Sequence, residues 1–344
     1  MGLWQWIWDR LIGGRGPHEP PATAVRRGTD IAVMEPPPES DTDASWWRPE
    51  GATRTEPAPV ERPPWGDLAR ALENRLAVNL SGQNLDLPPL PQVPHRVLQR
   101  LRDPHCDFGD LVNDIAEDQV IAASVLRLAN SPLYRGRDAI STLPTAVTRI
   151  GAKALKTLML HQSLRSATLG GRKPHPLAER IWHRSLVSAI IMRELSRFTR
   201  LDAEDAFLIG LLHDIGSVVV LREVSAQASI SRGTVDTATF EYLCHQSHEA
   251  FGELLAGAWG LPAHLKALIA DHHRHPPPDD PLRMERLQIM LADMLTAMLA
   301  GDEDAAYDLP NAGIVQDLGM AERNDFYSLL DRLPELVDEY SEGQ

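Results

Sequence analysis

Apolar residues recur at intervals of three and four along most of the chain from residue 65 onward. Leu68, Leu72 and Leu76 begin this pattern, and equivalent stripes follow in residues 97–101, 108–115, 120–128, 144–164, 177–198, 201–216, 263–270, 282–299 and 312–340. A period of 3.6 residues is typical of amphipathic helices, and the alternation of β-strands is nearly absent. The pattern therefore predicts an all-α fold.

Two stretches are less regular. The four apolar residues 218–221 fit either a short strand or a helix that continues after Gly216. His245 and His248 are polar interruptions, and we expect them to precede a helix that ends at the Gly260-Leu261-Pro262 turn.

The first 64 residues follow a different pattern. Residues 1–14 are rich in Trp and predict a short amphipathic helix, which is too short to be stable unless it docks on something. Its own globular part, a partner protein and a membrane interface all remain open as docking surfaces. Residues 15–64 hold eleven of the 27 prolines, and they predict a disordered Pro-rich linker.

Charge and composition narrow the class of protein. The net charge is −14, of which residues 301–344 contribute −10, with twelve acidic residues against two arginines. No basic stripe is present, which argues against nucleic acid as a partner. The first residues lack the basic start and long apolar core expected of a signal peptide, and no apolar run of about eighteen residues is found. Cys106 and Cys244 have no metal-site spacing. We expect a cytoplasmic protein, with peripheral membrane association if the N-terminal helix binds lipid.

The most informative stretch is LDAEDAFLIGLLHDIG, residues 201–216. Asp202 is the expected N-cap of a helix that is apolar on nearly all sides and therefore buried. The helix ends in His213 and Asp214. Burial makes these titratable groups costly unless they are paired or bind metal.

Several segments together resemble the HDOD domain, the HD-related output domain of bacterial signalling proteins. They are LPPLPQVPHRVLQRLRDP (87–104), LANSPLYRG (128–136), AISTLPTAVTRIG (139–151), WHRSL (182–186), FLIGLLHDIG (207–216) and AWGLPAHLKALIADHH (258–273). Gln119 departs from the family, which usually has proline there. The resemblance implies an HD-like helical bundle and a regulatory or scaffolding role.

The same resemblance suggests the domain organisation. We expect an HDOD domain over residues 65–280, with a helical N-terminal subdomain at 65–169 and an HD-like subdomain at 175–280. Residues 281–344 would supply C-terminal helices that complete the bundle and an acidic tail.

Similarity to the HD phosphohydrolases and the HD-GYP phosphodiesterases implies a set of candidate metal ligands. The set is Glu179, His183, His213, Asp214, His248, His272, His273 and Asp293. Imidazoles and carboxylates suit divalent Fe, Mn, Zn or Ni, and a two-metal site can activate water and clamp a phosphate. The alternative is an inherited, metal-free polar core. His245, His264 and His275 fall outside the pattern and are expected at the surface.

Two parts of the HD-GYP pattern are missing. Ser217 occupies the lysine position of HDIGK, and no Gly-Tyr-Pro follows His273. The first hypothesis is therefore signal transduction through contacts with other signalling proteins, without turnover. The alternatives are a metal-dependent phosphohydrolase or phosphodiesterase acting on a nucleotide or cyclic dinucleotide, and nucleotide sensing without turnover. The sequence carries no signal for an oligomeric state.

Overall fold

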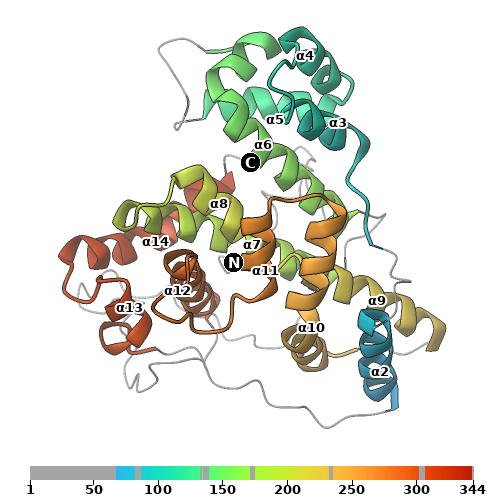
Figure 1. Ribbon diagram of the computed structural model, residues 1–344, viewed down its shortest axis with the longest axis vertical. Coiled ribbons are helices and arrows are strands. Elements are labelled where there is room, and N and C mark those ends of the chain that lie inside the picture. The colour runs from blue at the N-terminus through green and yellow to red at the C-terminus, as the bar shows by residue number, and fades with distance from the viewer. Residues whose placement is uncertain are drawn as a thin grey trace, which may run out of the picture.

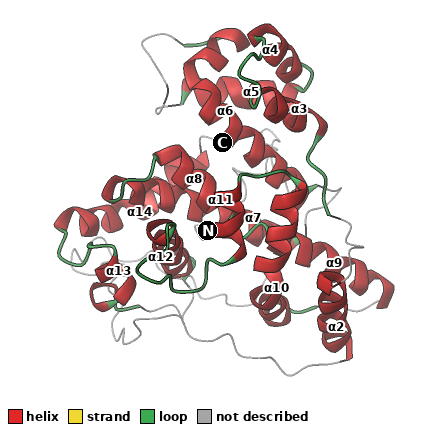
Figure 2. Cartoon of the chain, in the orientation of Figure 1, coloured by secondary structure: helices red, strands yellow, loops and turns green. Residues whose placement is uncertain are grey.

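The computed structural model describes residues 67–81, 87–131, 134, 139–170, 175–231, 235–301 and 307–342. Within these ranges the regular elements are helices (Figure 2), which confirms the all-α prediction. No helix among them is long and apolar enough to cross a membrane. The helix predicted for residues 1–14 and the linker predicted for residues 15–64 lie outside the described residues.

Most of the first helices form a group at one end of the molecule, at the top of Figure 1, whereas the helix Asp67–Ser81 lies at the other end. Their bounds are α2 Asp67–Ser81, α3 Gln92–Arg100, α4 Phe108–Ala116, α5 Gln119–Asn130 and α6 Leu143–Leu169. Helices α3, α4 and α5 pack on α6, which continues toward α7 and α8. Helix α2 instead packs against α9 and α10, where Arg75 forms an ion pair of 2.9 Å with Glu223.

The second group surrounds α7, which contacts α6, α8, α9, α12 and α14. Its elements are α7 Pro176–Leu195, the 3₁₀ turn η1 Ser196–Phe198, α8 Ala203–Leu212, α9 Gly216–Ser231, α10 Thr237–Ala258, α11 Ala263–Ala270, α12 Arg283–Leu299, the 3₁₀ turn η3 Leu309–Asn311, α13 Gly313–Asp317 and α14 Asn324–Glu342. The preceding helix α6 and several helices that follow α7 in the sequence all pack against it, so the residues of α7 are buried on nearly every side. The C-terminal helices α12 and α14 thus complete the packing around α7.

Helix α8 has the cap and the burial that its sequence indicated. The carboxylate of Asp202 accepts hydrogen bonds from the backbone N–H groups of Glu204 at 2.8 Å and Asp205 at 3.3 Å. These bonds satisfy donors that have no partner inside the helix. Every residue from Ala206 to Leu212 is buried, so α8 is a core helix that delivers His213 to the interior.

The two irregular stretches are both helical. Residues 218–221 belong to α9, which settles the choice between strand and helix. The prediction that His245 and His248 precede a helix is wrong, because α10 begins at Thr237 and contains both. Asp236 caps α10 by accepting the N–H of Thr239 at 2.7 Å. The polar residue His245 interrupts the apolar pattern because it lies on the exposed face of α10, and it does not mark the start of the helix.

Helix α6 bends at Gly151, where φ is 76°. A residue with a side chain is strained in this left-handed region, and glycine is not. The part of α6 after the bend contacts both groups, because Lys153 pairs with Asp202 and Asp205 at the start of α8, while Gln162 donates to Ser124 of α5 at 3.0 Å. This glycine therefore connects the two groups of helices.

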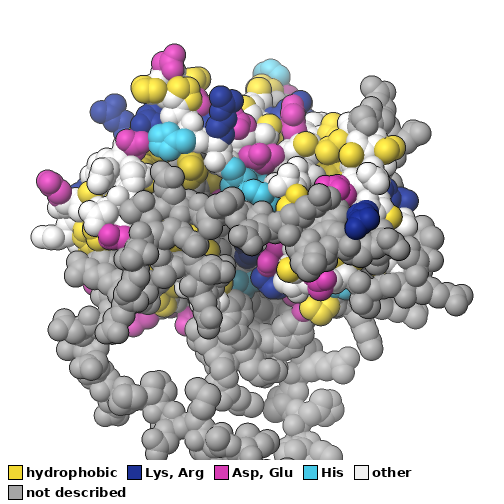
Figure 3. All heavy atoms as spheres, turned by 90° about the horizontal axis from the view of Figure 1, so that it is seen from below, with side chains coloured by type: hydrophobic (Ala, Val, Ile, Leu, Met, Phe, Trp, Pro, Cys, Tyr) yellow, Lys and Arg dark blue, Asp and Glu magenta, His cyan; other side chains and the backbone are white. Residues whose placement is uncertain are grey.

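Acidic and basic side chains alternate on the face shown in Figure 3. On the described part of that face, Lys and Arg side chains are interspersed with Asp and Glu, and histidine side chains reach the surface beside carboxylates. A phosphate backbone laid across it would meet both signs of charge.

Asn130 closes the loop between α5 and α6. Its amide nitrogen donates to the carbonyls of Leu126 at 2.9 Å and Ile140 at 2.8 Å, and its amide oxygen accepts the N–H of Ile140 at 2.8 Å. Asn130→Ala should lower the free energy of unfolding by about 2–3 kcal/mol, because both backbone groups of buried Ile140 lose their partner. Urea denaturation measures this. Asn311→Ala, which removes one exposed bond to Asp308, should change stability by less than about 0.5 kcal/mol.

Candidate metal centre

The chain turns at His213 and Asp214, between α8 and α9. Helix α9 begins at Gly216, where a Cβ atom would lie 1.8 Å from the carbonyl oxygen of His248 and 2.5 Å from the nitrogen of Gly252. Only a residue without a side chain permits this approach, so α9 starts in direct contact with α10. The contact brings Asp214 next to His248.

Histidines and carboxylates from α8 to α12 converge at this point. Two groups have ligand atoms that all lie within 4.8 Å of one another, and His272 belongs to both. The first group is Asp214, His248, His272 and His273, and the second is His213, His272 and Asp293.

Backbone carbonyls fix the tautomers of three buried imidazoles. The Nδ1 atoms of His213, His248 and His272 lie 2.8, 2.6 and 3.1 Å from the carbonyl oxygens of Gly210, Cys244 and Ile269. A carbonyl oxygen cannot donate, so each Nδ1 carries a hydrogen. In the neutral ring the Nε2 atom then holds a lone pair, which is the form that binds metal.

The lone pairs of the first group point at one another. The Nε2 atoms of His248 and His272 lie 3.1 Å apart, and His273 Nε2 lies 3.1 Å from His248 Nε2. Asp214 Oδ1 lies 3.2 Å from His248 Nε2 and 3.4 Å from His272 Nε2. Converging electron-pair donors repel unless an extra proton or a metal cation lies among them.

These separations match the spacing of ligands around a single ion. Ligand atoms bonded at about 2.0–2.1 Å lie about 2.8–3.0 Å from their neighbours in octahedral geometry and about 3.3–3.4 Å apart in tetrahedral geometry. The donor set, imidazole nitrogens with carboxylate oxygens, suits Zn, Fe, Mn or Ni. The residues present therefore fit a divalent metal ion.

The second group is organised by Asp293 of α12. Asp293 Oδ1 lies 3.0 Å from His213 Nε2, while its buried Oδ2 has no hydrogen-bond partner among the described residues. Burial opposes the protonation of His213, but the charges of Asp293 and Asp214 outweigh it and raise its pKa to about 9. The two carboxylates therefore stabilise a cation at this position, whether imidazolium or metal.

At two other imidazoles of the cluster, burial has a larger effect on the pKa than the neighbouring carboxylates have. It lowers the pKa of His248 and of His273, and the neighbouring carboxylates do not reverse this. These rings are therefore neutral near pH 7, as ligation requires.

Glu179 and His183 lie on α7, outside the two groups. Burial lowers the pKa of the His183 imidazole and raises that of the Glu179 carboxyl. Their role as ligands stays a prediction from the resemblance. His245, His264 and His275 are exposed, as expected, and His275 forms an ion pair of 3.1 Å with Asp317.

Two residues at the cluster were missed by sequence reasoning. Glu249 accepts the backbone N–H groups of His272 at 2.8 Å and His273 at 3.0 Å, and so holds both rings in place. Arg184 is exposed overall, and although partial desolvation of its guanidinium acts in the other direction, the charges of Asp214 and Asp293 raise the pKa of this group. Each follows a candidate histidine directly in the chain, and adjacency to a ligand was the available signal.

Comparison with known families gives one match, the HDOD domain, over residues 87–275. This span is more than half of the chain. The chain belongs to the HDOD family. A search of curated proteins found no match.

Solved structures share the fold of this HDOD protein. A "Putative metal-dependent phosphohydrolase" from Shewanella amazonensis is 19% identical with a TM-score of 0.64, and the alignment covers 80% of this chain and 100% of the other. A "Putative signal transduction protein" from Marinobacter aquaeolei is 22% identical with a TM-score of 0.56, covering 80% of this chain and 66% of the other. At these identities the likeness shows the fold alone.

Proposed function

We propose that this HDOD protein is a cytoplasmic bacterial signalling protein that acts through contacts with other signalling proteins and does not turn over a substrate. The observation that carries the proposal is Ser217, which is buried and hydrogen-bonds the thiol of Cys244. By resemblance, the related cyclic-dinucleotide phosphodiesterases place a lysine here. A buried neutral hydroxyl that faces a thiol supplies no charge to hold a substrate phosphate.

The signalling role is supported by the family and by the name of the Marinobacter structure, a signal transduction protein. We propose that the His-Asp cluster holds a divalent ion that ties the ends of α8 and α11 to α10 and α12. The first group offers four protein ligands. Four ligands close a tetrahedral site, which is the arrangement of structural zinc, whereas a catalytic site keeps one position open.

A second function, metal-dependent phosphohydrolysis, is favoured by Arg184. The charges of Asp214 and Asp293 raise the pKa of its exposed guanidinium, although desolvation opposes them. A guanidinium beside a metal can hold a phosphate in place of the missing lysine. The name of the Shewanella structure, a metal-dependent phosphohydrolase, supports this alternative.

Turnover assays separate the two functions. The purified full chain, loaded in turn with Mn, Fe, Zn and Ni, is mixed with bis(p-nitrophenyl) phosphate, nucleoside monophosphates and cyclic di-GMP. We expect no hydrolysis above the protein-free blank. Hydrolysis that Arg184→Gln reduces by about 100-fold or more, and that Arg180→Gln leaves unchanged, would establish the enzyme instead. Arg180 is the matched control because it lies on the same helix, paired with Glu241.

A genetic test addresses signalling directly. In a strain from which the gene for this protein is deleted, a copy that carries Arg184→Gln should restore the lost signalling response as fully as the wild-type copy. The reason is that the substitution leaves every candidate metal ligand in place. Failure of this variant, at wild-type protein levels and metal content, would contradict action by contact alone.

A further inference from the structure

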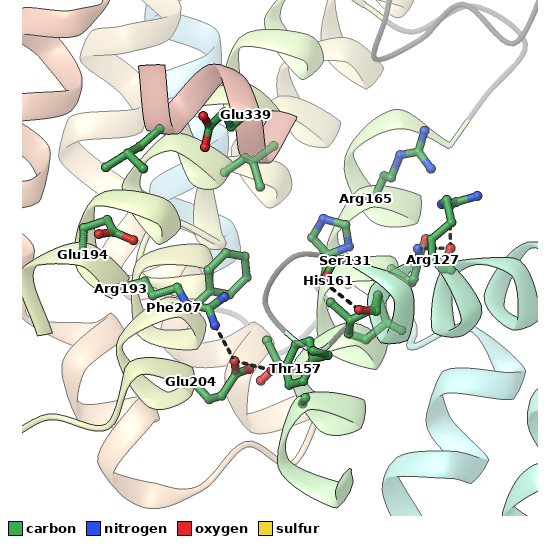
Figure 4. A pocket seen from close by; sticks show the side chains of 18 of the residues that line it. Arg127, Ser131, Thr157, His161, Arg165, Arg193, Glu194, Glu204, Phe207 and Glu339 are labelled. Carbon is green, nitrogen blue, oxygen red and sulfur yellow. Dashed lines mark hydrogen bonds and ion pairs between the residues drawn. The ribbon is translucent and has the colours of Figure 1, made fainter. Parts of the chain in front are cut away.

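A cavity of about 370 Å³ lies between the two groups of helices, away from the metal centre. One wall comes from α5 and α6, the other from α7 and α8, and α14 contributes Leu336 and Glu339 at its edge (Figure 4). None of the candidate metal ligands lines it. Its volume is that of a small-molecule pocket.

His161 of α6 is the feature that packing does not explain. The residue is 4% exposed, and neither ring nitrogen has a hydrogen-bond partner among the described residues. The ring lies 4.8 Å from that of Trp182 and faces the cavity (Figure 4). Burial lowers the pKa of His161 to about 3, so one nitrogen donates and the other accepts at neutral pH. A buried polar ring without partners is unfavourable unless a ligand supplies them.

The charges on the two walls differ. On the α7–α8 wall, Arg193 pairs with Glu204 at 3.1 Å and Arg197 with Glu194 at 2.7 Å, so these charges neutralise one another. On the α5–α6 wall, Arg127 and Arg165 have no carboxylate partner in the part of the chain that the structure describes.

Figure 4 shows these two arginines on the same side of the cavity as His161. Arg127 donates to the neutral hydroxyl of Ser124 at 2.9 Å. In a chain of net charge −14, two guanidinium groups without carboxylates at one cavity wall favour an anion, and the guanidinium fork matches phosphate.

Apolar side chains also line the cavity, beside polar residues such as Thr157 and Gln162. Leu128, Leu158, Leu186 and Phe207 surround the space between the walls. Such a surface accepts a flat, weakly polar ring, and it disfavours a free inorganic ion, which would leave the surface in contact with water.

We propose that this cavity binds a nucleoside monophosphate, with the phosphate at Arg127 and Arg165 and the heterocycle between the apolar walls, hydrogen-bonded to His161. The ligand contacts α5 and α6 on one side and α7 and α8 on the other. Binding therefore favours one arrangement of the two helical groups, which is how a small molecule shifts a conformational equilibrium.

Binding of AMP and of GMP to the purified full chain tests the proposal by calorimetry. At least one of the two nucleotides should bind with a stoichiometry of one molecule per chain and a dissociation constant in the micromolar range. Inorganic phosphate should bind at least ten times more weakly. His161→Phe and Arg165→Gln should each weaken binding at least tenfold. Arg180→Gln, on the outer face of α7, should stay within twofold. His161→Phe should also raise the unfolding midpoint of the ligand-free protein, since it removes unsatisfied polar atoms.

Several outcomes would overturn the proposal. One is that neither nucleotide binds at a concentration of about 1 mM, where even a weak specific site would be occupied. The others are inorganic phosphate binding as tightly as the nucleotide, and an unchanged affinity for the nucleotide in Arg165→Gln. Loss of binding in Asp214→Asn with retention in His161→Phe would assign the nucleotide to the metal centre. If His161→Phe does not fold, Arg165→Gln decides, because the Arg165 side chain is partly exposed and has no hydrogen-bond or ion-pair partner among the described residues.

Discussion

Replacing Asp214 by asparagine is expected to release the metal ion that we propose for the His-Asp cluster. The wild type should purify with about one divalent ion per chain, and Asp214→Asn with less than about a tenth of that. The charge of Asp214 is needed because its Oδ1 lies 3.2 and 3.4 Å from two imidazole nitrogens that share the proposed ion. An asparagine fills the same volume, so the variant leaves no cavity. Elemental analysis of the purified proteins measures the loss.

Stability supplies the second readout. An ion present at about 100 to 1,000 times its dissociation constant stabilises the folded state by roughly 3–4 kcal/mol. A chelator should therefore lower the unfolding free energy of the wild type by that amount and leave Asp214→Asn unchanged. His245→Ala is the matched control, since His245 is exposed and its ring lies 5.6 Å from that of His273 without belonging to either ligand group. A wild type with substoichiometric metal and no response to chelation would identify a metal-free polar core.

Gly216→Ala is expected to destabilise the protein by about 3 kcal/mol or more, because overpacking a tight helix contact forces the backbone to move. The added Cβ would lie 1.8 Å from His248 O and 2.5 Å from Gly252 N, and both are backbone atoms that cannot turn aside. The only relief is a separation of α9 from α10. His248 is a candidate ligand, so metal content should fall together with the midpoint of chemical denaturation.

Gly257→Ala is the control for this effect. Gly257 lies within the same helix as His248, and a Cβ there would meet nothing within 4 Å. Alanine is the better helix former, so this variant should be more stable than the wild type by about 0.5–1 kcal/mol. Equal stability of Gly216→Ala and the wild type would mean that α9 and α10 pack less closely than described.

The helices could be predicted well because their causes are local. The buried α8, its cap at Asp202 and the turn at His213 were all readable from sixteen residues. The error at α10 has the same origin, since His245 and Gln246 face solvent inside the helix and resemble a break when only neighbours in the sequence are considered.

The candidate site was predicted in part. Six of its proposed ligands converge, while Glu179 and His183 lie outside the two groups. Glu249 and Arg184 could not be assigned, because a carboxylate that accepts backbone N–H groups and a guanidinium that responds to distant charges have no motif of their own.

By itself the sequence determined the helical class, the HDOD family and the positions of the histidines and carboxylates. These depend on periodicity, capping and motif order, which act over a few residues. Only the tertiary structure decided that Asp293 meets His213 across 80 residues, and that His161 faces a cavity built by α5 to α8. Such meetings depend on how helices pack, and one glycine contact between α9 and α10 sets where Asp214, at the centre of the cluster, lies relative to His248.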